Sequence, residues 1–111
     1  MSDDINERIA RLVEPEPVSS ASSLNFSALG AWVSPNDYCR WEPVDFTYSV
    51  DRSLAVIERR WMGSTVLLSA RSARLTTIPG LRTTKYTYRA SDTTTSHAIA
   101  IALLAALEAE Q

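Results

Sequence analysis

Hydrophobic positions recur with a helical period over the last part of the chain. Residues 95–110 contain no Gly or Pro and are rich in Ala and Leu, the best helix formers. Residues 91–95 supply side-chain oxygens that can cap the first free N–H groups. Ile99, Leu103 and Leu107 form one stripe, and alanines cover most of the other side. A helix that is apolar nearly all round is usually buried, so we expect the large stripe to pack on a sheet. The alanine side can admit a second helix or another chain.

The same period predicts two further helices. In residues 3–13 the apolar side chains recur at i, i+4 and i+7, and Glu14-Pro15-Glu16-Pro17 ends the helix because a residue before proline is pushed out of the α region. A second helix begins at Ser49, a good N-cap, and carries a core stripe up to Trp61. Gly63 can close it in the left-handed conformation.

Shorter apolar runs predict strands. In residues 24–41, a β-hairpin or two short strands surround a turn signal, Ser34-Pro35-Asn36-Asp37. Residues 65–72 are β-branched and apolar, and residues 85–90 alternate cleanly, so both predict strands. Pro79-Gly80 is typical of a type II turn between them.

The order of these elements predicts a small α+β domain. At 111 residues the chain has room for one modest core. We expect a helix–sheet–helix sandwich, with an antiparallel sheet between helix layers and a buried Ala/Leu-rich C-terminal helix. Residues 1–17 form the N-terminal helix and its Pro-containing break, residues 18–23 a Ser-rich linker, and residues 24–111 the single α+β domain. The first stretch is the part most prone to detach or to swap between chains.

Charge and cysteine content bound the setting. The net charge of −2 gives no bulk attraction to nucleic acid or to anionic membranes, and the C-terminal helix is too short and Ala-rich for a membrane span. Residues 1–58 carry ten acidic and four basic side chains, net −6, whereas residues 59–111 carry three acidic and seven basic ones, net +4. The single cysteine, Cys39, excludes an internal disulfide and fits a reducing compartment. The acidic N-terminus lacks the basic region of a signal peptide, so we expect a cytoplasmic protein.

Basic and aromatic side chains gather on the predicted C-terminal hairpin. In a simple hairpin about Pro79-Gly80, Arg71 would lie across from Tyr88, and Arg74 across from Lys85. Such a surface can hold phosphates by bidentate contacts and stack bases. The competing interpretation is a solvated sheet face, or an edge protected by charge. The candidate ligand-binding residues are Arg71, Arg74, Arg82, Lys85, Tyr86, Tyr88 and Arg89.

Other candidates for chemistry are weaker. His97, the only histidine, needs an orienting carboxylate and a nucleophile, but neither Asp92 nor Ser96 shares its helical face by the 3.6 period. We therefore expect a surface or capping histidine. Cys39 lies beside Arg40, yet a free cysteine usually acts as a small buried hydrophobe. One Cys and one His cannot build a tetrahedral zinc site within one chain, so we expect no metal and no cofactor.

The acids near the second helix have structural explanations. Asp45, Asp51 and Glu58 could in principle serve glycoside or metal chemistry. Asp51, however, favours the positive end of the helix, and Glu58 is expected to be exposed beside arginines. The three glycines form neither a GxGxxG nor a P-loop motif.

Three motifs follow one another in a familiar order. Residues 41–43 (Trp-Glu-Pro) precede residues 46–51 (Phe-Thr-Tyr-Ser-Val-Asp) and residues 55–58 (Ala-Val-Ile-Glu). This order, with a closing Thr-x-x-x-Ala-Ile-x-x-Ala-Leu from Thr94 to Leu103, resembles the phage ABA sandwich group of small phage and prophage proteins. The resemblance covers roughly residues 30–111 and departs at the N-terminus, where the group often has Gly-Trp after its first helix. It implies a helix–sheet–helix sandwich and a phage or prophage origin. Many proteins of this kind are accessory factors, and some counter host defence.

These observations favour binding over catalysis. We expect a non-enzymatic accessory protein that binds a host-derived ligand, with a nucleotide or other anion held by the arginine hairpin. One alternative is an inhibitor or adaptor that docks on a host or phage protein, as a homo-oligomer built on the alanine face. A second alternative is a small hydrolase that uses His97 or the acids near Asp51.

Overall fold

The chain folds into three helices and two antiparallel sheets. A computed structural model describes residues 2–15, 27, 29–34, 41–77 and 85–110, with side chains from residue 5 onward. In chain order the elements are α1 (Ser2–Val13), β1 (Trp32–Val33), β2 (Glu42–Pro43), α2 (Val50–Arg60), β3 (Thr65–Ser69), β4 (Ser72–Thr77), β5 (Tyr86–Ser91) and α3 (Thr95–Ala109).

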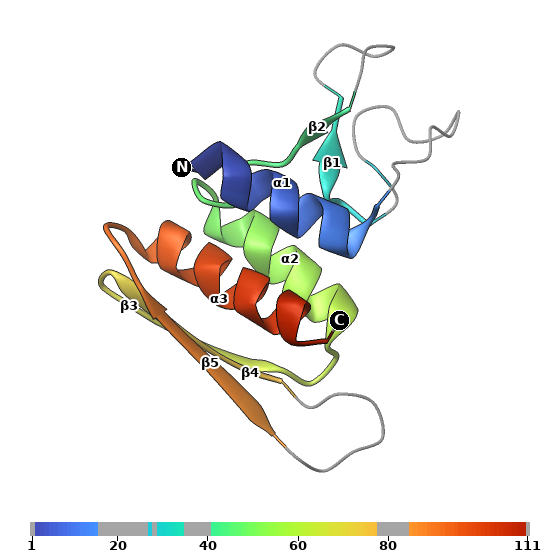
Figure 1. Ribbon diagram of the computed structural model, residues 1–111. Helices are drawn as coiled ribbons and strands as arrows, with labels where there is room; N and C mark the ends of the chain where they lie inside the picture. The colour runs from blue at the N-terminus through green and yellow to red at the C-terminus, as the bar shows by residue number, and fades with distance from the viewer. Residues whose placement is uncertain (1, 16–26, 28, 35–40, 78–84, 111) are drawn as a thin grey trace.

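The helix α3 is the centre of the packing. Figure 1 shows the three-stranded sheet on one side of α3 and the helices α1 and α2 on the other. The stripe residues Ile99, Leu103 and Leu107 are buried, as are Ala98 and Ala102 behind them. The α+β class, the antiparallel sheet and the buried C-terminal helix are therefore confirmed. Among the described residues all three helices lie on one side of the sheet, so the layers run sheet, α3, then α1 with α2.

Four alanines of α3 are buried within the chain: Ala98, Ala100, Ala102 and Ala106. The helix α1 packs against α3, and Ile9 and Ala10 of α1 are fully buried. Arg8 of α1 forms an ion pair with Glu108 of α3. The buried alanines are thus not available for a contact between chains, although Ala105 and Ala109 remain exposed.

Local signals begin the helices where the sequence predicts. The Ser49 hydroxyl accepts from the Arg52 N–H at the start of α2, and the Thr94 hydroxyl accepts from the His97 N–H at the start of α3. Gly63 follows α2 with φ +87°, the left-handed region that glycine enters without strain. In the described part of the chain, no helix has the length and apolar character needed to cross a membrane.

The C-terminal hairpin is not the predicted one. Residues 65–77 form two strands, β3 and β4, joined by Ala70 and Arg71, in place of one strand ending at Ser72. Arg74 pairs with Arg89, and Leu75 with Tyr88, so the expected pairs Arg74–Lys85 and Arg71–Tyr88 are wrong. The turn escaped prediction because neither Gly nor Pro marks it; Arg71 adopts the left-handed φ of 61° instead. The predicted turn at Pro79-Gly80 lies outside the described residues.

A two-stranded sheet closes the far end of the molecule. Trp32 pairs with Pro43 and Val33 with Glu42, so two short strands do flank the predicted turn. The turn itself, the Ser-rich linker and Cys39 lie outside the described residues. The indole N–H of Trp32 donates to the Glu14 carbonyl, which ties this sheet to the end of α1.

Candidate functional site

The outer face of the three-stranded sheet carries the candidate site. Successive strand residues point to opposite faces, and positions 66, 73, 75 and 88 face α3. The other face presents three cross-strand rows among the described residues. These rows are Thr65–Thr76–Thr87, Leu67–Arg74–Arg89 and Ser69–Ser72–Ser91.

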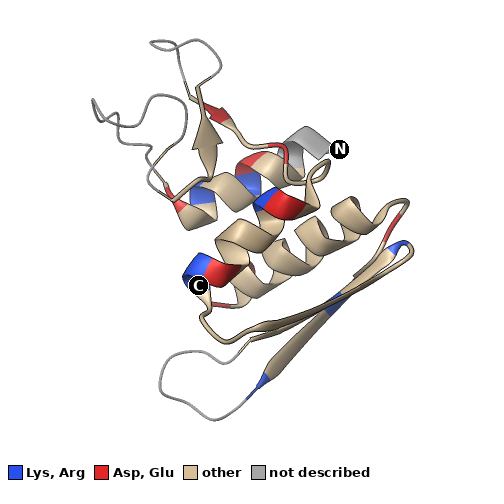
Figure 2. Ribbon diagram, turned by 180° about the vertical axis from the view of Figure 1, so that it is seen from behind, with Lys and Arg blue, Asp and Glu red and all other residues tan. Residues whose placement is uncertain are grey.

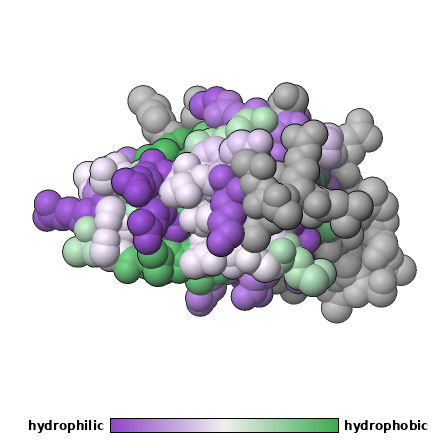
Figure 3. Space-filling view, turned by 90° about the horizontal axis from the view of Figure 1, so that it is seen from below, coloured by the Kyte–Doolittle hydropathy of each residue, from purple (hydrophilic) through white to green (hydrophobic). Residues whose placement is uncertain are grey.

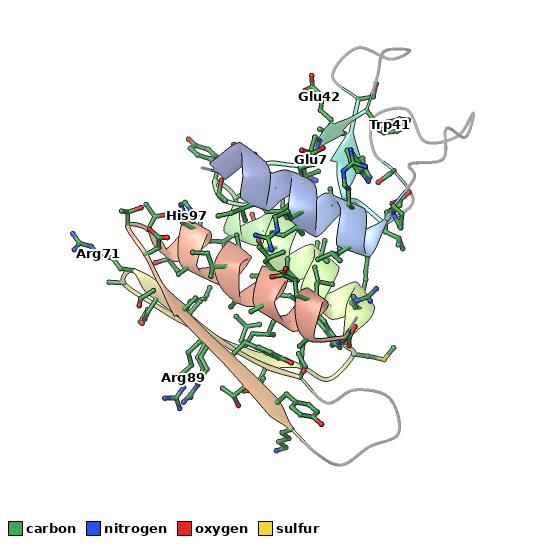
Figure 4. The ribbon with its side chains drawn as sticks, in the orientation of Figure 1. Glu7, Trp41, Glu42, Arg71, Arg89 and His97 are labelled. Atoms are coloured by element: carbon green, nitrogen blue, oxygen red, sulfur yellow. The ribbon has the colours of Figure 1, made fainter. Side chains whose placement is uncertain are left out.

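Arg74 and Arg89 form the charged centre of this face. They lie directly opposite each other on β4 and β5, and both are exposed. They are the only charged residues on the three strands. In Figure 2 blue positions lie near the middle of the sheet and towards its two ends. Figure 4 shows Arg89 directed away from the helices. Among the described residues neither arginine forms an ion pair with a carboxylate, so two like charges face one another without a protein counter-charge.

The two arginines border a shallow depression. Its volume is about 500 Å³, and it reaches from the centre of the face to the β3–β4 turn. Figure 3 views the molecule from the sheet side and shows strongly hydrophilic residues among residues of intermediate hydropathy. The depression thus offers two guanidinium groups, hydroxyl groups and apolar contacts together. Its lining consists of Leu67, Leu68, Ser69, Ser72, Ala73, Arg74, Arg89, Ala90 and Ser91.

The remaining predicted residues do not join this centre as one cluster. Arg71 lies at the tip of the β3–β4 turn and points into solvent (Figure 4). Tyr86 and Tyr88 share the parity of Ala90 and lie on the helix side of β5, so they do not interleave with the arginines. Lys85 is exposed just before β5, and Arg82 lies outside the described residues.

Tyr88 has a packing role on the inner face. It is half-buried against the core, next to Leu75 on β4. Burial raises the pKa of the Tyr88 hydroxyl, and the negative charge of Glu110 raises it further. A tyrosine in this position can fill the gap between sheet and helix, but it cannot stack on a ligand bound to the opposite face.

A second polar cluster lies at the start of α3. The Asp92 carboxylate accepts from the Thr93 N–H at 2.6 Å and lies 3.7 Å from Nε2 of His97. The 3.6-residue period predicts that Asp92 does not share the helical face of His97. Asp92 nevertheless lies near the His97 ring, because it precedes the helix and the helical period does not apply to it. The backbone hydrogen bond from Thr93 lowers the pKa of Asp92, and the nearby His97 lowers it further, against partial desolvation.

This cluster lacks an available nucleophile. The Ser96 hydroxyl donates to the Thr47 carbonyl at 2.9 Å. This hydrogen bond joins the loop before α2 to the start of α3. Within the described residues no hydroxyl is hydrogen-bonded to the His97 ring. The cluster therefore consists of the capping hydrogen bonds at the N-terminus of α3 and one long contact between His97 and Asp92.

The three acidic residues near α2 do not form one site. Asp45 accepts from the Asn6 side chain at 3.0 Å and from the Thr47 hydroxyl at 2.9 Å, so it joins α1 to the loop before α2. Asp51 and Glu58 are exposed on α2. No group of three His, Cys, Asp or Glu side chains that could hold a metal ion occurs in the described part of the chain.

Sequence reasoning missed the neighbours of the two arginines. Leu67 and the rows of Ser and Thr became visible only with the register of β3 against β4. The stretch 65–77 contains 13 residues, more than the usual strand of about 5–6. The segment Ser69-Ala70-Arg71-Ser72 in its middle was the available signal of a turn between two strands.

Comparisons with known proteins add no relative to this picture. No protein-family model, no curated protein and no solved structure matches the chain.

Proposed function

We propose that this protein is a non-enzymatic accessory protein that binds a small phosphate-bearing anion, such as a nucleotide, on the outer face of its sheet. Arg74 and Arg89 hold the phosphate, and the serine and threonine rows supply further donors. The phage or prophage origin and a role against host defence belong to the proposal through the sequence resemblance alone. The cytoplasmic setting is proposed from the acidic N-terminus and the single cysteine.

The observation that supports the proposal is the unpaired arginine couple. Like charges directly opposite in a sheet destabilise it, yet Arg74 and Arg89 have no carboxylate partner among the described residues. A bound anion between them removes this repulsion. Each guanidinium can then make two parallel N–H···O bonds to phosphate oxygens.

The shape of the surface suits a ligand of nucleotide size. The depression of about 500 Å³ falls within the usual range of ligand sites, about 300–1,000 Å³. A guanidinium plane can stack on a base, so a nucleotide does not need the tyrosines of the opposite face. Leu67 supplies an apolar contact beside the charges.

Thermal shifts against a panel of mono-, di- and cyclic nucleotides and pyrophosphate test the proposal. A ligand at 100 times its Kd adds about 2.7 kcal/mol to the free energy of unfolding. We expect at least one phosphate compound to raise the melting temperature of the wild-type protein. The variant Arg74→Gln with Arg89→Gln should lose that rise, because each charge-assisted hydrogen bond contributes about 1.5–3 kcal/mol.

A matched control uses arginines on another surface. Arg59→Gln with Arg60→Gln changes the net charge equally on α2 and should keep the ligand-induced rise. Loss of the rise in both double variants would show a nonspecific charge effect. A flat panel with the wild-type protein would contradict anion binding.

A role as a protein-docking inhibitor or adaptor is the second candidate. It is favoured by Leu67 and Leu68, which expose 49% and 41% of their surface on β3. A flat nucleotide panel, together with a host protein whose binding is lost on changing these leucines, would favour this function.

A further inference from the structure

The β3 edge of the sheet lacks the features that usually keep strand edges apart. The sheet order is β3-β4-β5, and in the described part of the chain no strand pairs with the free side of β3. Natural sheets protect such edges with charged residues, Pro or bulges. The sequence of β3, Thr-Val-Leu-Leu-Ser, contains no charged residue and no Pro, and it pairs with β4 without a bulge.

The opposite edge of the same sheet is protected. Strand β5 carries Arg89, and Lys85 precedes it directly. Two exposed leucines on β3 therefore contrast with two exposed cations at the other edge, Arg89 on β5 and Lys85 just before it. This asymmetry singles out β3 as the edge available for pairing with another strand.

The order of side chains along β3 is symmetric about its middle residue. Thr65 and Ser69 are polar ends, and Val66 and Leu68 flank Leu67. We propose that β3 pairs antiparallel with β3 of a second copy of this chain, about a two-fold axis at Leu67. Leu67 then meets its own copy, Val66 meets Leu68, and Thr65 meets Ser69. Every apolar residue faces an apolar one and every polar residue a polar one, as an isologous contact requires.

This pairing creates one continuous six-stranded sheet. Strand spacing of about 4.8 Å places the two copies of Arg74 roughly 14 Å apart, three spacings, with the Leu67 pair between them. That distance exceeds the screening length of about 8 Å at physiological salt, so their repulsion is weak. The two arginine couples consequently lie on one common face.

The contact is small and must be reversible. Five residues of an extended strand span only about 17 Å, and contacts below about 1,200 Å² are usually weak. We therefore expect a monomer–dimer equilibrium in the micromolar-to-millimolar range.

Sedimentation equilibrium over about 10 µM to 1 mM protein tests the dimer, since this range covers such affinities. The wild-type mass should rise from 12.3 kDa towards twice that value. Leu67→Lys should shift the equilibrium at least about tenfold towards the monomer, because it places two like charges at the axis. Thr87→Lys, the same charge on the same face at the β5 edge, should dimerise like the wild type. Circular dichroism confirms that each variant is folded.

Disulfide trapping gives an independent positive test. In a Cys39→Ser background, Leu67→Cys should form a covalent dimer on mild oxidation, because directly opposed Cβ atoms lie about 4.5–5.5 Å apart. Thr87→Cys should not form one efficiently. A wild-type protein that stays monomeric at 1 mM, or dimers blocked by Thr87→Lys and not by Leu67→Lys, would overturn the proposal.

The dimer and the anion site fail separately. The dimer rests on the β3 edge, whereas anion binding rests on Arg74 and Arg89. We expect the double variant Arg74→Gln with Arg89→Gln to keep dimerising while it loses pyrophosphate binding.

Discussion

At the scale of single residues, the arrangement of charge distinguishes Arg74 and Arg89 from the other described arginines. Arg60, for example, pairs with the Glu110 carboxylate at 3.1 Å. Arg74 and Arg89 instead face each other. This arrangement should lower the stability of the ligand-free protein.

Removing one of these charges should not weaken the fold. We expect Arg74→Gln to raise the free energy of unfolding by up to about 1 kcal/mol in low salt, because it relieves cross-strand repulsion. The gain should shrink in high salt, which screens exposed charges. Urea unfolding at two salt concentrations measures it. A loss of more than 1 kcal/mol would show that Arg74 makes a stabilising contact and would contradict the like-charge account.

The β3–β4 turn contains a second residue-scale prediction. Arg71 holds φ 61°, a left-handed conformation that costs an L-residue roughly 1–2 kcal/mol. Arg71→Gly should relieve that strain and offset the greater entropy of glycine, for a net gain of about 0.5–1 kcal/mol. Arg74→Gly, the same change within a strand, should instead destabilise. Equal effects of the two changes in urea unfolding would contradict the turn geometry.

These residues show what alternation alone can and cannot predict. The candidate ligand-binding residues come from one stretch of sequence, yet the pleat divides the described ones between two faces and a turn. The sequence places Arg74 and Arg89 on one hairpin, but only the register of the strands shows that they pair with each other. Register depends on the turn, and Ala70-Arg71 carries no Gly or Pro to announce it.

At the scale of elements, the N-terminal helix is held by a specific polar link. Asn6 is only 6% exposed; its side chain donates to Asp45 and accepts from the Thr47 N–H at 3.1 Å. The sequence predicted α1 from its period, but not where it packs, because a stripe does not identify its partner. The contact with α3 places α1 in the common core.

Truncating Asn6 should loosen this attachment. We expect Asn6→Ala to lower the free energy of unfolding by about 1–3 kcal/mol, because it leaves the buried Thr47 N–H without a partner. Glu7→Ala, which removes only an exposed i,i+4 pair with Arg11, should cost at most about 0.5 kcal/mol. Urea unfolding compares the two. Similar small losses would mean that the Asn6 link adds nothing to the attachment of α1.

The start of α3 should give the protein part of its acid sensitivity. The pKa of Asp92 is lowered below its ordinary 3.8, chiefly by the Thr93 N–H. The native state therefore binds this proton less readily than the unfolded state. The resulting stability is complete above the ordinary value and is lost as the pH falls through the lowered one.

Asp92→Asn should remove that acid-dependent part. The variant should be less stable than the wild type at pH 7, and the two should converge in strong acid. Glu58→Gln on α2 removes one exposed charge and serves as the control. Unfolding by denaturant at several pH values provides the measurement. A stability difference that persists unchanged into strong acid would exclude the Asp92 carboxylate as its source.

At the scale of the whole molecule, the fold was more predictable than the site. Periodicity specified α2 and α3 closely, since the caps Ser49 and Thr94 and the buried stripe act locally. The site depends on which sheet face the helices leave open, and this follows from how the layers stack. Because α1, α2 and α3 lie on one side, no other helix or strand of the described part of the chain covers the opposite face (Figure 1).

The most direct test of the central claim is a nuclear magnetic resonance titration with pyrophosphate and with ATP. Backbone amides and Arg side-chain Nε–H groups report where an anion sits. The account predicts shifts at β4 and β5, centred on Arg74 and Arg89, that disappear in the variant Arg74→Gln with Arg89→Gln. Shifts confined to the helices or to the N-terminal residues, or none at millimolar ligand, would contradict an anion site on the outer face of the sheet.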